Sequence, residues 1–131
     1  MIAVDTNVLV RFIAADDPGQ LALARSLFEH ESIFIPKTVL LETERVLRSA
    51  YRVAPDVLAA AIRRLLGLSN VTLEGGATIG RALDWYDSGF DFADALHLAS
   101  CGPATGFATF DRMLERRARS VEDAPAVALL S

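Results

Sequence analysis

The sequence predicts an α/β fold in which a central, mainly parallel sheet of about four to five strands lies between layers of helices. Short apolar runs alternate with longer segments of helical periodicity along all 131 residues, and strands that are joined through helices pair in parallel. No repeat or low-complexity linker divides the chain, and its length is that of one domain. With 52% hydrophobic residues, residues 1–131 can build one core, so we expect a single domain.

Turn and capping residues set the expected elements of the first half of the chain. The sequence Asp-Asp-Pro-Gly at residues 16–19 is typical of a turn that supplies the N-cap and first turn of a helix. Pro36 ends one apolar run, and Pro55 stands at a helix start. In order, we expect a strand at 2–4, a helix at 7–15, a helix from the turn to about 30, a strand at 32–35, and helices at 38–50 and 55–66.

The second half continues the alternation of strands and helices. In order, we expect a strand at 71–73, helices at 77–88 and 92–101, a strand at 107–109, a helix at 112–118 and a last strand near 126–128. Ligands of parallel sheets bind at the carboxyl ends of the strands, so functional residues are expected there.

Composition excludes several classes of protein. Acidic or basic residues interrupt each apolar stretch before the ~18 residues that span a bilayer, and the N-terminus lacks the basic region of a signal peptide. The single cysteine, Cys101, excludes an internal disulfide and favours a reducing cytoplasm, and no Cys or His spacing suits zinc. The net charge of −4 argues against a nucleic-acid ligand unless a metal ion changes the local charge.

Two aspartates occupy equivalent positions after strands. Asp5 follows the first predicted strand and precedes a helix, and Asp111 does the same after residues 107–109. Aspartate is a preferred N-cap, so either residue alone is explained by capping. Their repetition at the carboxyl ends of two strands also favours a shared site.

Helical phase singles out Glu42 on the helix at 38–50. At 100° per residue, Val39 and Val46 lie on the apolar stripe and Glu42 falls between them, whereas Glu44 projects with Arg48 to the solvent side. We therefore expect Glu42 to point inward. A buried carboxylate needs a cation or a proton, and the alternatives are a metal ion and a salt bridge to an arginine.

The segment from Asp91 to His97 places two aspartates at one helix start. Asp91 is expected at the N-cap and Asp94 three residues later, which approximates a capping box. Asp94 lies off the apolar stripe and at the positive end of the helix dipole, so it is free to face a cleft as a carboxylate. His97 is interpreted as a packed or surface residue, since no second histidine lies at a ligand spacing.

Four carboxylates, those of Asp5, Glu42, Asp94 and Asp111, thus come from separate segments. If they converge, their mutual repulsion raises some of their pKa values unless a divalent cation neutralises them. Ligation by oxygen alone selects Mg²⁺ or Mn²⁺, and carboxylates that hold such ions are the arrangement used for attack on phosphodiesters.

These four segments resemble the PIN-domain ribonucleases, and among them the VapC-like toxins of type II toxin–antitoxin systems. The resemblance extends over nearly the whole chain. The segments that carry it are IAVDTNVL at residues 2–9, LETERVL at 41–47, DFADALHLA at 91–99 and ATFD at 108–111.

The resemblance implies a PIN-like three-layer fold and a Mg²⁺-dependent endoribonuclease, inhibited by a cognate antitoxin at its active site and commonly a homodimer. It implies that Asp5, Glu42, Asp94 and Asp111 are catalytic and bind the metal ion. By the same analogy, Thr6 or Asn7 and Thr109 position water or substrate.

Arginines follow two of the acidic segments. Arg45, Arg48 and Arg52 are expected on one outward face after Glu42, and four more follow Asp111, namely Arg112, Arg116, Arg117 and Arg119. They are candidates for RNA phosphate contacts, and a solvated face with ion pairs between neighbouring turns explains them equally well.

Other functions for a small α/β domain with acids at strand ends stay open. A phosphoacceptor receiver domain needs paired acids after the first strand and a late lysine, whereas Lys37 is the only lysine here. A haloacid-dehalogenase-like phosphatase needs Asp-x-Asp where this chain has Asp5-Thr6-Asn7. A non-catalytic interaction module is the third alternative, and it predicts no activity with any metal.

Overall fold

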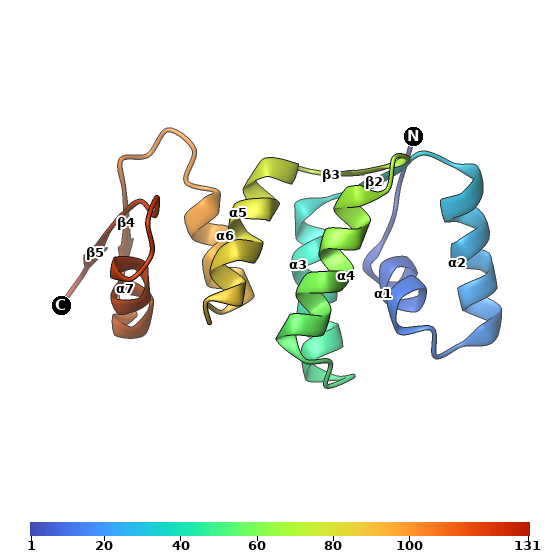
Figure 1. Ribbon diagram of the computed structural model, residues 1–131, viewed down its shortest axis with the longest axis horizontal. Coiled ribbons are helices and arrows are strands. Elements are labelled where there is room, and N and C mark those ends of the chain that lie inside the picture. Colours follow the sequence, from blue (N-terminus) through green and yellow to red (C-terminus); the bar gives the residue numbers. More distant parts are fainter. The chain divides into compact units, whose positions relative to one another are not determined.

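The computed structural model describes residues 1–131, which form two compact units, Met1–Gly76 and Ala77–Ser131 (Figure 1). The first unit contains β1 (Ile2–Ala3), α1 (Thr6–Ala14), α2 (Pro18–His30), β2 (Ile33–Ile35), α3 (Lys37–Ser49), α4 (Pro55–Gly67) and β3 (Val71–Leu73). The second contains most of α5 (Gly76–Asp87), then α6 (Phe92–Ala99), β4 (Gly106–Thr109), α7 (Arg112–Arg119) and β5 (Ala126–Leu129). None of the helices is both long and apolar enough to span a membrane.

The strands confirm the predicted α/β class. All five pair in parallel, and hydrogen bonds connect them as a three-stranded sheet in the order β1-β2-β3 and a two-stranded sheet of β4 and β5. Every predicted helix and strand is present, with ends that differ by no more than two residues. The predicted strand at 71–73 has the observed ends.

The core of the first unit lies between its helices and the three-stranded sheet. Ile33 and Ile35 of β2 are fully buried, because β2 is the central strand and has a neighbour on each edge. Leu9 of α1 is also fully buried. On the α1–α2 side, the rings of Phe12 and Phe28 stack with centroids 4.0 Å apart.

The hairpin between α1 and α2 is fixed to the end of α3 by a polar network. The Tyr51 hydroxyl accepts a hydrogen bond from Arg11 Nη1 at 2.7 Å and donates one to Asp16 Oδ2 at 3.0 Å. Hydrogen bonds among charged groups are stronger than those among neutral groups. This network therefore restrains α1, whose N-terminus follows Asp5 directly.

The second unit has its own apolar core around α5 and α6. Ile79 and Leu83 of α5 and Phe92 of α6 are fully buried. The ring of Tyr86 meets that of Phe92 edge to face, with centroids 5.2 Å apart. Because Phe92 is the first residue of α6, this packing fixes the end of the helix that presents Asp91 and Asp94.

Candidate metal centre

The second unit contains a hollow of about 190 Å³ at the N-terminal ends of α6 and α7. Asp91, Asp94 and Asp111 line it together. The remaining lining residues are Phe90, Met113, Leu114 and Arg117. The structure thus brings together Asp94 and Asp111, two of the four acids predicted from the sequence.

Backbone hydrogen bonds hold two of these aspartates in place. Asp111 is the N-cap of α7, and its Oδ1 accepts hydrogen bonds from the amides of Met113 at 2.9 Å and Leu114 at 3.1 Å. The Asp111 amide in turn donates to Thr109 Oγ1 at 3.0 Å. Because Oδ1 takes both capping bonds, the cap fixes the carboxylate without using Oδ2, which stays available to a ligand.

At α6, Asp91 caps the helix by accepting a hydrogen bond at Oδ2 from the Asp94 amide, 3.2 Å away. This is the N-cap predicted from the sequence. The three-residue spacing then places Asp94 in the first turn of α6, close to Asp91, where the helix dipole favours a negative charge. Asp94 is half-buried and faces the hollow, as its place off the apolar stripe predicts.

Charge in the hollow is only partly compensated. The pKa of Asp94 is raised, first by burial and then by the negative charges of Asp91 and Asp111, while His97 and Arg117 oppose the rise. A raised carboxyl pKa means that the hollow disfavours a further negative charge. A cation bound among these oxygens would lower the pKa again.

In the first unit, Asp5 follows β1 and caps α1. Its Oδ1 accepts a hydrogen bond from the Thr6 amide at 2.8 Å, and the carboxylate is exposed. Thr6 is buried, whereas Asn7 is exposed. Glu42 lies on α3, the helix against which α1 packs. Asp5, at the N-cap of α1, and Glu42, on α3, therefore belong to two elements of one unit that pack together.

The expected burial of Glu42 is wrong. Glu42 is exposed, and the carboxylate that α3 buries is Glu44, which is 2% exposed. The buried face of α3 is formed by Leu40, Thr43, Glu44 and Leu47, at the three- and four-residue spacing of one helical stripe. Glu44 is tolerated there because Arg48 Nε donates to its Oε2 at 2.8 Å.

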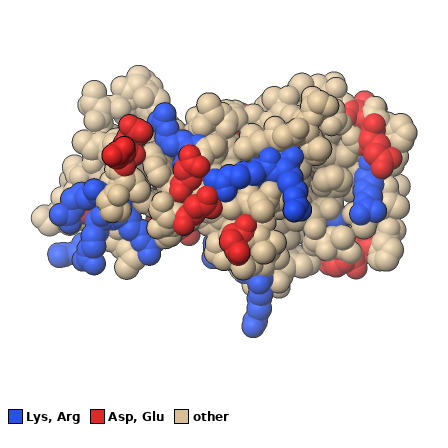
Figure 2. Space-filling view, in the orientation of Figure 1, with Lys and Arg blue, Asp and Glu red and all other residues tan.

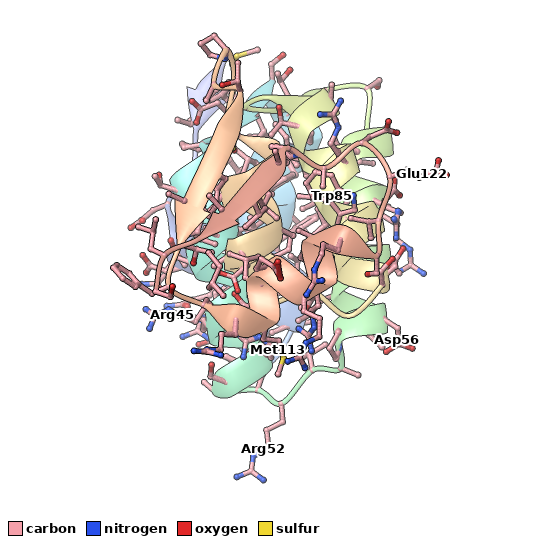
Figure 3. The ribbon with its side chains drawn as sticks, turned by 90° about the vertical axis from the view of Figure 1, so that its left-hand side faces the viewer. Arg45, Arg52, Asp56, Trp85, Met113 and Glu122 are labelled. Carbon is pink, nitrogen blue, oxygen red and sulfur yellow. The ribbon has the colours of Figure 1, made fainter.

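The arginines also differ from the sequence expectation. Arg52 lies beyond the end of α3 at Ser49, in the left-handed backbone region, and projects away from the chain (Figure 3). It therefore does not share a helical face with Arg45. On α7, Arg112, Arg116 and Arg119 are exposed, and in the view of Figure 2 Lys and Arg side chains gather over the α7 end of the chain.

The sequence predicted Asp91 only as an N-cap and Arg117 only as one of several candidates for phosphate contacts, whereas the structure places both at the hollow. The N-cap-to-N3 spacing is a signal that could have placed Asp91 beside Asp94, whereas Arg117 reaches the hollow only through the packing of α7. Asp5 and Glu42 belong to one unit, and Asp94 and Asp111 belong to the other. Neither unit holds three or more acidic, His or Cys side chains placed to bind one metal ion.

Comparison with protein families gives one match, to the PIN domain, over residues 2–120. The matched range covers nearly all of the first unit, the second unit up to the end of α7, and all four acids predicted from the sequence. PIN domains are generally nucleases and typically use divalent metal ions. No curated protein matches the chain.

Proposed function

The chain belongs to the PIN domain family, and from this premise we propose that it is a Mg²⁺-dependent endoribonuclease and the toxin of a type II toxin–antitoxin pair. Asp5, Glu42, Asp94 and Asp111 are the proposed metal-binding and catalytic residues. Asp91 is a further acid beside Asp94 and Asp111 in the hollow.

The hollow at the N-terminal ends of α6 and α7 is the observation that most favours this function. Three of its lining residues carry carboxylate oxygens, the ligands that Mg²⁺ and Mn²⁺ prefer. The pKa of Asp94 is raised by burial first and then by the negative charges of Asp91 and Asp111. The donor chemistry therefore fits a divalent cation. The hollow by itself has no set of three placed ligands, and Asp5 and Glu42 of the first unit are proposed as ligands because their segments resemble those of the PIN-domain ribonucleases.

The chain's own residues hold and orient the reacting groups. The capping bonds to the Met113 and Leu114 amides fix the Asp111 carboxylate, and this arrangement avoids the cost of ordering it during the reaction. Asp94, half-buried and facing the same hollow, restricts where a phosphodiester and a water molecule can lie. Mg²⁺ held by these carboxylates would supply Lewis acidity for hydrolysis of the P–O bond.

The direct test is cleavage of a mixed panel of single-stranded RNAs by the purified chain. The reactions contain Mg²⁺ or EDTA, and DNAs of the same sequences measure the preference for RNA. Asp5→Asn and Asp94→Asn are expected to abolish cleavage. Asp56→Asn, which changes an exposed carboxylate on α4, is the matched control and is expected to cleave normally.

Cleavage that needs Mg²⁺ and both aspartates supports the proposal. Cleavage that survives EDTA or either substitution contradicts the mechanism. If no RNA in the panel is cut with any metal, the non-catalytic interaction module becomes the better hypothesis.

The proposed partners are the cognate antitoxin and a second copy of the chain. An apolar groove of about 510 Å³ between α1 and α4 supports a protein ligand, because Phe12, Val57 and Leu68 line it and the last two are exposed. Co-expression with the product of the adjoining reading frame is expected to give a complex that co-purifies and does not cleave RNA. Light scattering of the chain alone measures whether it is a dimer.

A further inference from the structure

Charged side chains of both signs line the hollow at the N-terminal ends of α6 and α7. The acids are Asp91, Asp94 and Asp111, and the only basic lining residue is Arg117. The hollow is therefore negative overall when its carboxylates are ionised, but less negative than the three aspartates alone would make it. The positive charge comes from the same helix whose N-cap is Asp111.

The packing of α7 directs Arg117 toward the hollow. Arg117 lies one turn after Met113, and both residues line the hollow. Leu114 and Ala118, on the neighbouring face of α7, are buried and hold the helix in place. Arg117 itself is half-buried, whereas Arg116 is exposed. Because water screens a half-buried charge less than an exposed one, Arg117 acts more strongly on its surroundings than Arg116 does.

Arg117 also differs from its neighbours on α7 in its pairing. Arg119 binds Glu115, with Nη2 3.0 Å from Oε2. Arg117 takes part in no close ion pair, although it lies near enough to Asp94 to lower the pKa of that carboxyl. The guanidinium therefore acts on the hollow through its charge and does not occupy the carboxylate oxygens. An arginine keeps this charge at every physiological pH.

The size of the hollow places any ion that binds there close to Arg117. Its volume is about 190 Å³, which corresponds to roughly six water molecules at ~30 Å³ each. A partly hydrated divalent cation among the aspartates fills most of this space. The guanidinium and the cation then repel each other over a short distance.

We propose that Arg117 is a built-in counter-cation of the hollow, which keeps its aspartates ionised before a divalent cation binds and lowers their affinity for that cation. This inference rests on the proposed metal-dependent function and adds to it how the occupancy of the metal site is regulated. The charge that stabilises the carboxylates in the absence of metal opposes the metal once it binds. Occupancy of the site therefore follows the free concentration of the ion.

A different role for Arg117 predicts the opposite sign. If the guanidinium served mainly to position the carboxylates as ligands, its removal would disorder them and weaken metal binding. As a counter-cation, its removal strengthens metal binding and destabilises the chain that has no metal. The direction of the change in affinity therefore distinguishes the two roles.

Mn²⁺ binding to the full chain, measured without RNA from the electron paramagnetic resonance signal of the free ion, tests the proposal. Arg117→Gln is expected to bind Mn²⁺ roughly 3- to 10-fold more tightly than the wild type, the size of a water-screened repulsion between a monovalent and a divalent cation. Arg117→Met, which keeps the apolar stem without the charge, should bind equally tightly. Arg117→Lys, which keeps the charge, and Arg116→Gln, the matched control on the same helix, should bind as the wild type does.

Thermal unfolding gives a second measurement on the same chains. Arg117→Gln is expected to have a lower Tm than the wild type in EDTA, because its aspartates lose their counter-charge, and a larger rise of Tm on addition of Mn²⁺. Arg116→Gln should match the wild type in both.

Three outcomes overturn the proposal. They are weaker Mn²⁺ binding in both neutral variants of Arg117, equal affinities in Arg117→Gln and Arg116→Gln, and no Mn²⁺ binding by the wild-type chain. The first two contradict the role of Arg117 and leave the proposed ribonuclease intact. The third contradicts the metal-dependent function as well, so the failures of the two proposals are distinguishable.

Discussion

Asp111 is both the N-cap of α7 and a proposed metal ligand, and two substitutions separate these roles. Asparagine caps a helix as well as aspartate does, so Asp111→Asn is expected to keep the hydrogen bonds from the amides of Met113 and Leu114 while it removes the negative charge. Asp111→Ala removes both the bonds and the charge. Both variants therefore lose the proposed metal ligand, but only Asp111→Ala also loses the helix cap.

The expected changes in Tm follow from the stability that the N-cap contributes. Helix α7 has only eight residues, too few to be stable alone, so its first turn depends on these bonds. Loss of an N-cap costs about 1 kcal/mol, which for a chain of this size lowers Tm by about 3–5 °C. Asp111→Asn loses only the favourable charge at the helix N-terminus and is expected to lower Tm by less than half as much.

The Tm, measured by circular dichroism in EDTA, reports the stability that the N-cap contributes. Mg²⁺-dependent RNA cleavage reports the role of Asp111 as a metal ligand. We expect both variants to lose cleavage, and only Asp111→Ala to lose the full 3–5 °C. Mg²⁺ is expected to raise the Tm of the wild-type chain and not that of Asp111→Asn, because only an ion that binds the folded state stabilises it. Wild-type cleavage by Asp111→Asn would refute the reasoning and leave Asp111 as a cap alone.

Three further changes test other parts of the structure. The pKa of Asp94 is raised in the folded chain, so without metal its contribution to stability is lost as pH rises from the ordinary value of 3.8 through the raised one. In EDTA, the free energy of unfolding of Asp94→Asn should therefore rise relative to that of the wild type as the pH increases above 3.8. The gain should be less than about 1 kcal/mol because the carboxyl group is partly solvated. If the difference in unfolding free energy between the two chains does not change with pH, the burial and repulsion of Asp94 do not affect stability. Arg52 has φ 56°, in the left-handed region that glycine adopts without strain. Arg52→Gly should therefore raise the free energy of unfolding by about 0.5 kcal/mol, measured by urea unfolding, and a lower free energy of unfolding would contradict this strain. Tyr51→Phe removes the hydroxyl between Arg11 and Asp16 and should cost about 1 kcal/mol in the same assay, whereas no change would mean that this network contributes nothing to stability.

The elements of the fold were predictable because their signals are local. The run Val71-Thr72-Leu73 lies between the end of one helical segment and Gly75, which has φ 64°. β-Branched and apolar residues between such breaks form strands in most surroundings. The same argument located the caps at Asp91 and Asp111, since an N-cap is decided by one side chain and the next three amides.

The orientation of α3 was not predictable from hydrophobicity. The sequence argument placed Glu42 inward, since it lies between Val39 and Val46, and treated Glu44 as solvated. The structure buries Thr43 and Glu44 instead. The Thr43 hydroxyl donates to the Val39 carbonyl at 2.7 Å and Glu44 binds Arg48, so both polar groups are satisfied without water. Hydropathy counts such residues as exposed, because it does not include the partners that make their burial possible.

The contents of the hollow depend on packing between segments far apart in the sequence. Residues 91 and 94 are close on one helix, and the sequence could place them together. Bringing Asp111 and Arg117 to the same hollow requires α7 to pack beside the start of α6, which no local pattern encodes.

The net charge of −4 does not weigh against an RNA ligand once the positions of the charges are known. At physiological ionic strength, exposed charges act over a Debye length of about 8 Å, so an RNA phosphate near α7 responds to that helix and hardly to acids elsewhere in the chain. The four arginines of α7 attract phosphates, and the aspartates at its N-terminal end repel them unless a cation is bound. Metal and RNA binding should therefore be coupled: Mg²⁺ should strengthen the binding of a non-cleavable RNA analogue to the wild-type chain more than its binding to Asp111→Asn, and an equal effect on the two chains would contradict the coupling.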